Sequence, residues 1–267
     1  MTVRRIAGFR LVTADPARLS AFYRALGFDV GEAAPIPATD MALLGLRGAG
    51  SRITLSLGPS RVDLESFTPA GRPYPDEATA CDLLFQHLAL VTDNAEAAWV
   101  RARDAGALPI SRQGPVALPK SAGGVTAVKF RDPEGHPLEF LQFLPGANPD
   151  WKGTGILGID HSAISVSDVA ASQRFYAQMG LSARAATVNE GPTQQALDGL
   201  DAVQVDVVPM APGEAPPHVE LLGYRHPVGR RLKPVASNDI AATRIVWRSD
   251  REALLRDPDG HLHQFSR

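Results

Sequence analysis

The chain has 267 residues, enough for two domains of ordinary size, and its 44% apolar and 21% charged residues are typical of a folded globular protein. A formal net charge of −2 provides no basic field that would attract nucleic acid or anionic lipid, which argues against both roles. Cys81 is the only cysteine, so an intramolecular disulfide is excluded and a reducing compartment is favoured. The N-terminal residues contain no apolar run typical of a signal or membrane segment, and we expect a cytoplasmic protein.

The first predicted module covers residues 5–70. Alternating apolar residues predict a strand at 8–15, which ends in an aspartate that can cap a helix. The aromatic pair Phe22-Tyr23 then falls in a helical pattern that stops at a glycine, a common helix C-cap. A closing strand is predicted at 61–67. A strand, a helix and a closing strand therefore define this module.

A second copy of the pattern covers residues 83–145. Its first strand lies at 86–93, its helix at 95–106 and its closing strand at 137–143. The turn Asp132-Pro-Glu-Gly-His136 precedes the closing strand, where Pro and Gly supply hairpin geometry. The order of elements is that of the first module.

Residues 146–156 are rich in turn formers and are expected to link two halves of the chain. The third module, 157–225, resembles the first most closely: its strand at 161–168 ends in an aspartate, and a Phe-Tyr pair again follows seven residues later. Its closing strand is expected at 218–224. We therefore predict two domains, 1–145 and 157–267.

The fourth module, 238–267, is shorter than the others. Its first strand is expected at 242–250 and its closing strand at 262–265, after the turn Asp257-Pro-Asp-Gly-His261. Asp257 follows Asp250 by only seven residues. We therefore expect this module to have lost its helix and its inner strands.

The combination of His-x-Ala-x-x-Val-x-Asp, Phe-Tyr-x-x-x-Gly and Asp-Pro-x-Gly-His resembles the vicinal oxygen chelate superfamily, which includes glyoxalase I, extradiol dioxygenases and bleomycin-resistance proteins. The resemblance covers nearly the whole chain. It implies an α+β fold in which repeated βαβββ modules form two glyoxalase-like domains with curved mixed sheets. It says less about the reaction.

In that superfamily, metal ligands come from one position in the first strand and one in the last strand of each module. Only the two middle modules carry a histidine and a glutamate at these positions, with similar separations of 52 and 59 residues. Imidazole and carboxylate ligands together suit Fe, Mn, Co, Ni or Zn. The matching positions, in module order, are Gly8 and Asp63, His87 and Glu139, His161 and Glu220, and Arg244 and Gln264.

Two pairings of modules are possible. If the first module pairs with the fourth and the second with the third, one site collects His87, Glu139, His161 and Glu220 and the other becomes a relic. If consecutive modules pair, Asp63 joins His87 and Glu139 in one site, leaving a two-residue site in the second half. We favour the first pairing.

The resemblance implies a metal that holds two adjacent oxygens of a small-molecule substrate, with Glu139 or Glu220 as the general base for lyase or isomerase chemistry through an enediolate. An extradiol dioxygenase using Fe(II) and a metal-free, drug-sequestering protein are the alternatives. Specificity is expected from segments 112–124 and 189–200. A monomer or a homodimer is expected.

Other polar and aromatic residues have structural explanations of equal or greater weight. His136 and His261 fit turn roles, whereas His218, His226 and His263 lie near strand ends. The Phe-Tyr pairs fit the core, because they recur in modules with and without a complete ligand pair. Residues that could line a substrate pocket are Arg72, Tyr74, Trp151 and Tyr224.

Overall fold

Strands from the first and fourth modules form one curved mixed sheet, which we call the outer-module sheet. In the computed structural model, which describes residues 2–267, its seven strands have the order β16-β17-β15-β1-β4-β3-β2. β1 pairs antiparallel with β15 and parallel with β4. The strands are β1 (Ile6–Val12), β2 (Asp29–Pro35), β3 (Ala49–Leu57), β4 (Ser60–Thr68), β15 (Arg244–Arg248), β16 (Ala253–Arg256) and β17 (Leu262–Ser266).

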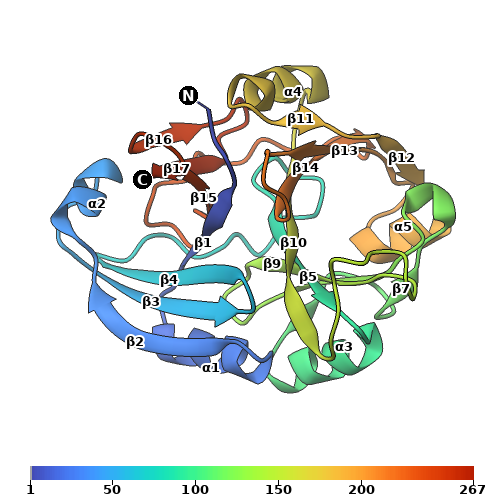
Figure 1. The fold of residues 1–267 in the computed structure, drawn as a ribbon, viewed down its shortest axis with the longest axis horizontal. Helices are drawn as coiled ribbons and strands as arrows, with labels where there is room; N and C mark the ends of the chain where they lie inside the picture. Colours follow the sequence, from blue (N-terminus) through green and yellow to red (C-terminus); the bar gives the residue numbers. More distant parts are fainter. Residues whose placement is uncertain (1) are drawn as a thin grey trace.

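The second and third modules form the middle-module sheet, beside the first sheet in Figure 1. Its ten strands follow the path β11-β13-β14-β10-β5-β9-β8-β6, with β12 paired to β13 and β7 to β8. The strands are β5 (Gln86–Thr92), β6 (Leu108–Pro109), β7 (Val116–Ala117), β8 (Thr126–Arg131), β9 (Pro137–Gln142), β10 (Ile156–Ser165), β11 (Ser182–Ala183), β12 (Thr187–Glu190), β13 (Gln204–Ala211) and β14 (His218–His226).

This topology confirms the predicted pairing of the first module with the fourth and of the second with the third. β10 and β5 run antiparallel at the junction of the two middle modules. Each sheet contains strands from before and after residues 146–156. The division into domains 1–145 and 157–267 therefore stays a prediction drawn from the sequence repeats.

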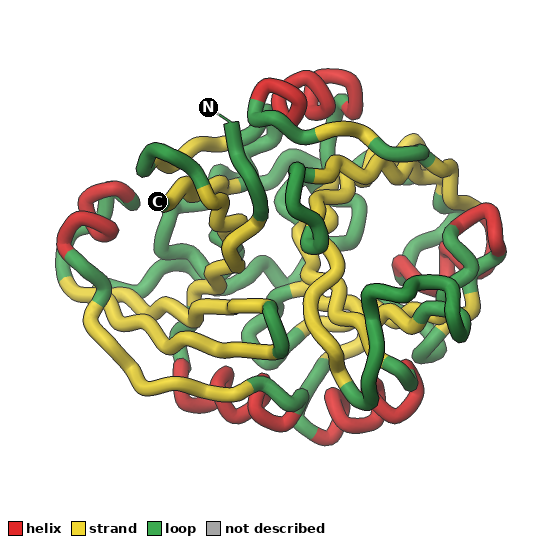
Figure 2. The backbone as a smooth tube through the Cα atoms, viewed as in Figure 1, coloured by secondary structure: helices red, strands yellow, loops and turns green. Residues whose placement is uncertain are grey.

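The helices lie around the outside of the sheets, with α1 and α3 on one side and α4 on the opposite side (Figure 2). Asp15 and Asp168 cap α1 and α4, each accepting a hydrogen bond from a backbone N–H three residues later. Among residues 2–267, no helix has the length and hydropathy needed to cross a bilayer. The helices are α1 (Pro16–Ala25), α2 (Ala38–Leu43), α3 (Ala95–Asp104), α4 (Val169–Gln178), α5 (Gly191–Asp198) and the 3-10 helix η1 (Lys120–Ala122).

The fourth module corrects one expectation. As expected, the described residues between β15 and β17 form no helix. An inner strand remains, however, because β16 pairs antiparallel with β17 in a hairpin. Four residues, Ala253–Arg256, are enough for this strand, and they fit between Asp250 and Asp257. A short strand so close to a turn carries too few alternating residues to be recognised from the sequence.

The Asp-Pro-x-Gly-His turns tie consecutive modules together. The hydroxyl of Tyr23 on α1 donates to Asp132 Oδ2 at 3.2 Å, and His136 Nδ1 lies 2.8 Å from the same oxygen. On the other side of the molecule, the hydroxyl of Tyr176 on α4 donates to Asp257 Oδ2 at 3.3 Å. These turn histidines and helix tyrosines therefore have the structural roles that their recurrence indicates.

Several charged side chains of the outer-module sheet are buried. Arg244 and Glu65 are fully buried and form an ion pair, and Arg52 Nη2 lies 2.7 Å from Glu65 Oε1. Arg10 adds contacts at 3.5 Å to both Glu65 and Asp63. Burial raises the pKa of Glu65, but these guanidinium groups outweigh it and hold the pKa below its ordinary value. Arginines thus occupy the place where a cation would have to bind.

Arg244→Met should destabilise the protein by roughly 3–5 kcal/mol, because it removes one partner of a buried ion pair. The buried negative charge of Glu65 would then have fewer positive neighbours. Urea unfolding followed by circular dichroism measures this. Arg248→Met, on the same strand but with an exposed side chain, is the control and should cost less than about 1 kcal/mol. Equal effects of the two substitutions would show that the buried pair has no special importance.

Candidate functional site

Strand register brings the predicted ligands of the middle modules onto one face. Ala163 on β10 lies opposite both His87 on β5 and Glu220 on β14. Ala89 on β5 lies opposite both His161 and Glu139. Residues two apart on a strand point to the same face, so all four side chains project to one side. The two buried alanines between them leave space for this convergence.

The ligand atoms approach each other closely. His87 Nε2 lies 3.0 Å from Glu139 Oε2, and His161 Nε2 lies 3.6 Å from the same oxygen. Glu220 Oε2 is 3.5 Å from His161 Nε2. His87, Glu139 and His161 offer ligand atoms that all lie within 4.8 Å of one another. Glu220 stands at the more open side, with its side chain 20% exposed against 7% for Glu139.

A neighbouring carboxylate orients His161. Asp160 Oδ2 lies 3.0 Å from His161 Nδ1, and Asp160 Oδ1 accepts a hydrogen bond from Trp151 Nε1 at 3.2 Å. A carboxylate can only accept here, so Nδ1 of His161 carries the proton and Nε2 faces Glu139 and Glu220. Such carboxylate–histidine contacts commonly orient metal-binding histidines. Trp151, predicted to line a pocket, contacts the site through Asp160.

The electrostatics of the cluster favour a positive charge between the side chains. Burial alone would lower the pKa of His161, but Glu220, Asp160 and Glu139 outweigh it and raise the pKa well above its ordinary value. Burial lowers the pKa of His87, which favours its neutral form. Within the described part of the chain, Nε2 of both histidines is buried and faces carboxylate oxygens, but neither atom makes a well-aligned hydrogen bond. A divalent cation fits this set of two imidazoles and two carboxylates.

His218 belongs to the same cluster, although the sequence indicated only a strand-end histidine. Its Nε2 lies 3.5 Å from Glu220 Oε1, and it forms a second compact group with Asp160 and His161. The signal in the sequence was the spacing: His218 precedes Glu220 by two residues on one strand, so both side chains point to the same face.

The cluster lines a cavity of about 400 Å³. Its walls are largely apolar and include residues from both segments expected to set specificity, for example Leu118 and Leu197. Tyr224 lines the cavity, whereas Arg72 and Tyr74 lie outside it. Arg72 is held by Asp239, with Nη2 2.6 Å from the carboxylate, and Tyr74 is buried under the guanidinium of Arg131.

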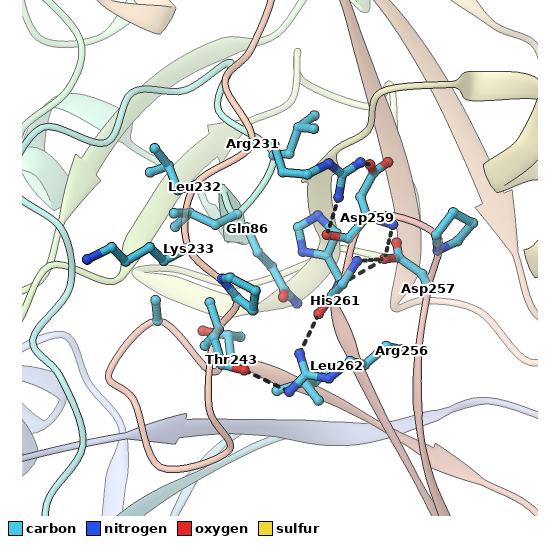
Figure 3. Close-up of a pocket in the computed structure, with 17 residues that line it drawn as sticks. Gln86, Arg231, Leu232, Lys233, Thr243, Arg256, Asp257, Asp259, His261 and Leu262 are labelled. Carbon is cyan, nitrogen blue, oxygen red and sulfur yellow. Dashed lines mark hydrogen bonds and ion pairs between the residues drawn. The ribbon is translucent and has the colours of Figure 1, made fainter.

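A second cavity, of about 410 Å³, lies between the 231–235 loop and the hairpin that ends in β17 (Figure 3). Its charged side chains, apart from Lys233, make ion pairs or hydrogen bonds within the protein. Arg231 Nη2 lies 2.6 Å from Asp259 Oδ1, and Arg256 donates to the backbone carbonyls of Val235 and Gly260. Because these polar groups satisfy one another, the cavity offers no cluster comparable to that of the middle-module sheet.

Comparisons with known proteins support this fold. Residues 5–140 match the model of the Glyoxalase/Bleomycin resistance protein/Dioxygenase superfamily, and no curated protein matches the sequence. The fold is similar to that of a glyoxalase I mutant from Zea mays, with 15% identity, a TM-score of 0.62 and coverage of 98% of this chain and 92% of that one. It is also similar to a putative dioxygenase from Bacillus subtilis, with 14% identity, a TM-score of 0.57 and coverage of 99% and 85%. The family match spans half of the chain, and the protein therefore belongs to the Glyoxalase/Bleomycin resistance protein/Dioxygenase superfamily.

Proposed function

We propose that this protein is a metal-dependent enzyme that binds a small substrate through two adjacent oxygens and performs lyase or isomerase chemistry of the glyoxalase I type. One observation carries the proposal: His87, Glu139, His161 and Glu220 converge on one cavity, with both histidine Nε2 atoms buried, facing carboxylates and without a well-aligned hydrogen bond in the described chain. Fe, Mn, Co, Ni and Zn all suit these ligands.

A divalent cation held by these four residues would supply a Lewis acid that polarises a substrate carbonyl and makes the neighbouring C–H bond more acidic. The chain supplies the groups that move the proton. Glu220 is the better placed base, because it stands at the open side of the cluster and Glu139 is enclosed by both histidines. Glu220 would take the proton from one carbon and return it to the adjacent one.

Hydrogen exchange tests this chemistry without knowledge of the natural substrate. Protein loaded with Zn²⁺, Ni²⁺, Co²⁺ or Mn²⁺ is incubated in D₂O with 2-hydroxyacetophenone, which offers two adjacent oxygens and an acidic C–H. We expect metal-dependent loss of that C–H signal in proton NMR. Exchange at the rate of metal-free protein for every metal would contradict the proposal.

A second function is supported by one specific feature. His87, His161 and Glu139 form the tightest group in the cluster, and two histidines with one carboxylate are the usual ligands of non-haem Fe(II) oxygenases. An extradiol dioxygenase is therefore the second candidate function. Oxygen uptake by Fe(II)-loaded protein with catechol distinguishes it: rapid, stoichiometric uptake with ring cleavage would replace the lyase assignment.

Metal retention should decrease as the pH falls from about 8 to about 5, because protons compete with the cation for imidazole nitrogens. The raised pKa of His161 means that its Nε2 binds a proton at a higher pH than an ordinary histidine does. Metal content after dialysis at each pH measures this. Retention that stays constant over this range would argue against histidine ligands.

A further inference from the structure

Beside the metal-binding cluster, the cavity wall carries a buried polar network centred on Asp198, and its Lys129 lies directly opposite Glu139 in the β8–β9 register. Lys129 Nζ lies 2.6 Å from Asp198 Oδ1. Gln194 Nε2 and the Tyr224 hydroxyl donate to Asp198 Oδ2 at 2.8 and 3.0 Å. Lys129, Gln194 and Tyr224 all line the cavity. The network is therefore a fixed polar surface that a molecule bound in the cavity would meet.

Gln194 presents an unused acceptor at this surface. Asp198 can only accept hydrogen bonds, so the amide nitrogen of Gln194 must point towards it and Oε1 must point away. Gln194 is 4% exposed, and its Oε1 has no hydrogen-bond partner among residues 2–267. A buried acceptor of this kind is costly unless a ligand or a water molecule satisfies it. On the preceding strand, Oδ1 of Asn189 accepts a hydrogen bond from the Thr187 hydroxyl, which leaves the Asn189 side-chain NH₂ group as a donor.

The Asp198 network carries no free positive charge. Lys129 is the only lysine or arginine among the described residues that line the cavity, and Asp198 neutralises it. A substrate carboxylate would lose its hydration here beside Asp198 without gaining a cationic partner. A neutral hydroxyl or carboxamide would satisfy Gln194 Oε1.

The cavity wall between Glu220 and Tyr224 suits a small substrate. Glu220 and Tyr224 lie four residues apart on β14, and both line the cavity. At about 3.3 Å per residue, they are roughly 13 Å apart along the strand. Leu141, Val207 and Leu222 belong to the apolar wall of this cavity. An aromatic ring or a short aliphatic chain would span the gap.

We propose, building on the metal-dependent function above, that the substrate is neutral and largely apolar, with two adjacent oxygens at the metal and a hydroxyl or carboxamide at the Asp198 network that donates a hydrogen bond to Gln194 Oε1. Substrates with a carboxylate at the Asp198 network are disfavoured. Gln194 is thus a specificity-determining residue.

Hydroxamates test this assignment, because each presents two adjacent oxygens to a metal and carries a variable group on the opposite side of a ring. Binding to Zn²⁺-loaded protein is measured by titration calorimetry for benzohydroxamate and its 4-hydroxy, 4-methoxy and 4-carboxy derivatives. We expect the 4-hydroxy compound to bind about five- to tenfold more tightly than the 4-methoxy compound, as one neutral hydrogen bond allows. The 4-carboxy compound should bind at least about tenfold more weakly than the parent.

Gln194→Met keeps the length of the side chain and removes both the acceptor and the donor to Asp198, so the preference for the 4-hydroxy over the 4-methoxy compound should disappear. The control is Gln264→Met. Gln264 is as deeply buried and its Oε1 is also unpartnered in the described chain, but it lies in the outer-module sheet. This variant should retain the preference.

The outcomes separate the two proposals. If the parent hydroxamate binds only in the presence of Zn²⁺, but the 4-carboxy compound binds best or Gln194→Met retains the 4-hydroxy preference, the substrate assignment is overturned and the metal function stands. If the parent does not bind to Zn²⁺-loaded protein, or binds equally without metal, the metal function fails and the substrate assignment fails with it. The comparison of ligands on the unaltered protein does not depend on the folding of a variant.

Discussion

His161→Ala is expected to remove nearly all bound divalent metal from the purified protein. His161 Nε2 lies within 3.6 Å of the carboxylates of both Glu139 and Glu220, so its loss takes away a central ligand. Even residues that only orient metal ligands contribute about 10- to 100-fold to affinity, and we expect a direct ligand to contribute more than about 100-fold. Elemental analysis after dialysis measures the effect.

The matched control is Asp63→Ala. Asp63 occupies the corresponding position in the outer-module sheet, where it accepts hydrogen bonds from Thr54 and Arg61. Removing it should leave metal content unchanged, and circular dichroism should show that both variants are folded. His161 is only 4% exposed, so its substitution should also cost about 1–3 kcal/mol of stability. Loss of metal in the Asp63 variant and retention in the His161 variant would place the site elsewhere.

Glu220→Gln should reduce the rate of C–H exchange by about 10²- to 10⁴-fold at saturating metal, because an amide oxygen can still approach the cation but cannot take up a proton. NMR exchange in D₂O measures the rate, and elemental analysis confirms that metal is bound. Glu139→Gln should instead lower metal retention, since Glu139 lies between both histidines.

An exposed glutamate provides the control for this comparison. Glu214→Gln changes a side chain that is 62% exposed and paired only loosely with Arg5, so it should leave exchange unaffected. If Glu220→Gln exchanged the substrate proton as fast as Glu214→Gln, Glu220 could not be the base, and Glu139 or a solvent species would have to take its place.

Most of the fold could be predicted because the modules repeat. The recurrence of a strand ending in aspartate, followed by a Phe-Tyr pair, marks the first and third modules, and the retained His and Glu pairs of the middle modules indicate which modules share a sheet. The strand β16 was missed because four residues beside a turn carry little periodicity. The buried ion network of Arg10, Arg52, Glu65 and Arg244 was also missed, since arginines in strands usually point to solvent.

Less of the candidate site than of the fold could be predicted from the sequence. Its four proposed ligands follow from position within the repeat, but Asp160 and His218 enter through contacts across strands. Lys129, Gln194 and Asp198 carry no motif at all. Lys129 and Asp198 are 69 residues apart, and only the fold brings them together. Arg72 and Tyr74 were proposed from their chemistry alone, and each contacts structural partners outside the cavity.

Anomalous diffraction from crystals of the protein as purified tests the central proposal most directly, because it locates a metal and identifies the element by its absorption edge. We expect a single strong peak between His87, Glu139, His161 and Glu220, and none in the outer-module sheet near Asp63. A peak beside Asp63, or hydrogen-bonded water in place of metal after the crystals are soaked in Zn²⁺ and Ni²⁺, would contradict the metal-dependent function.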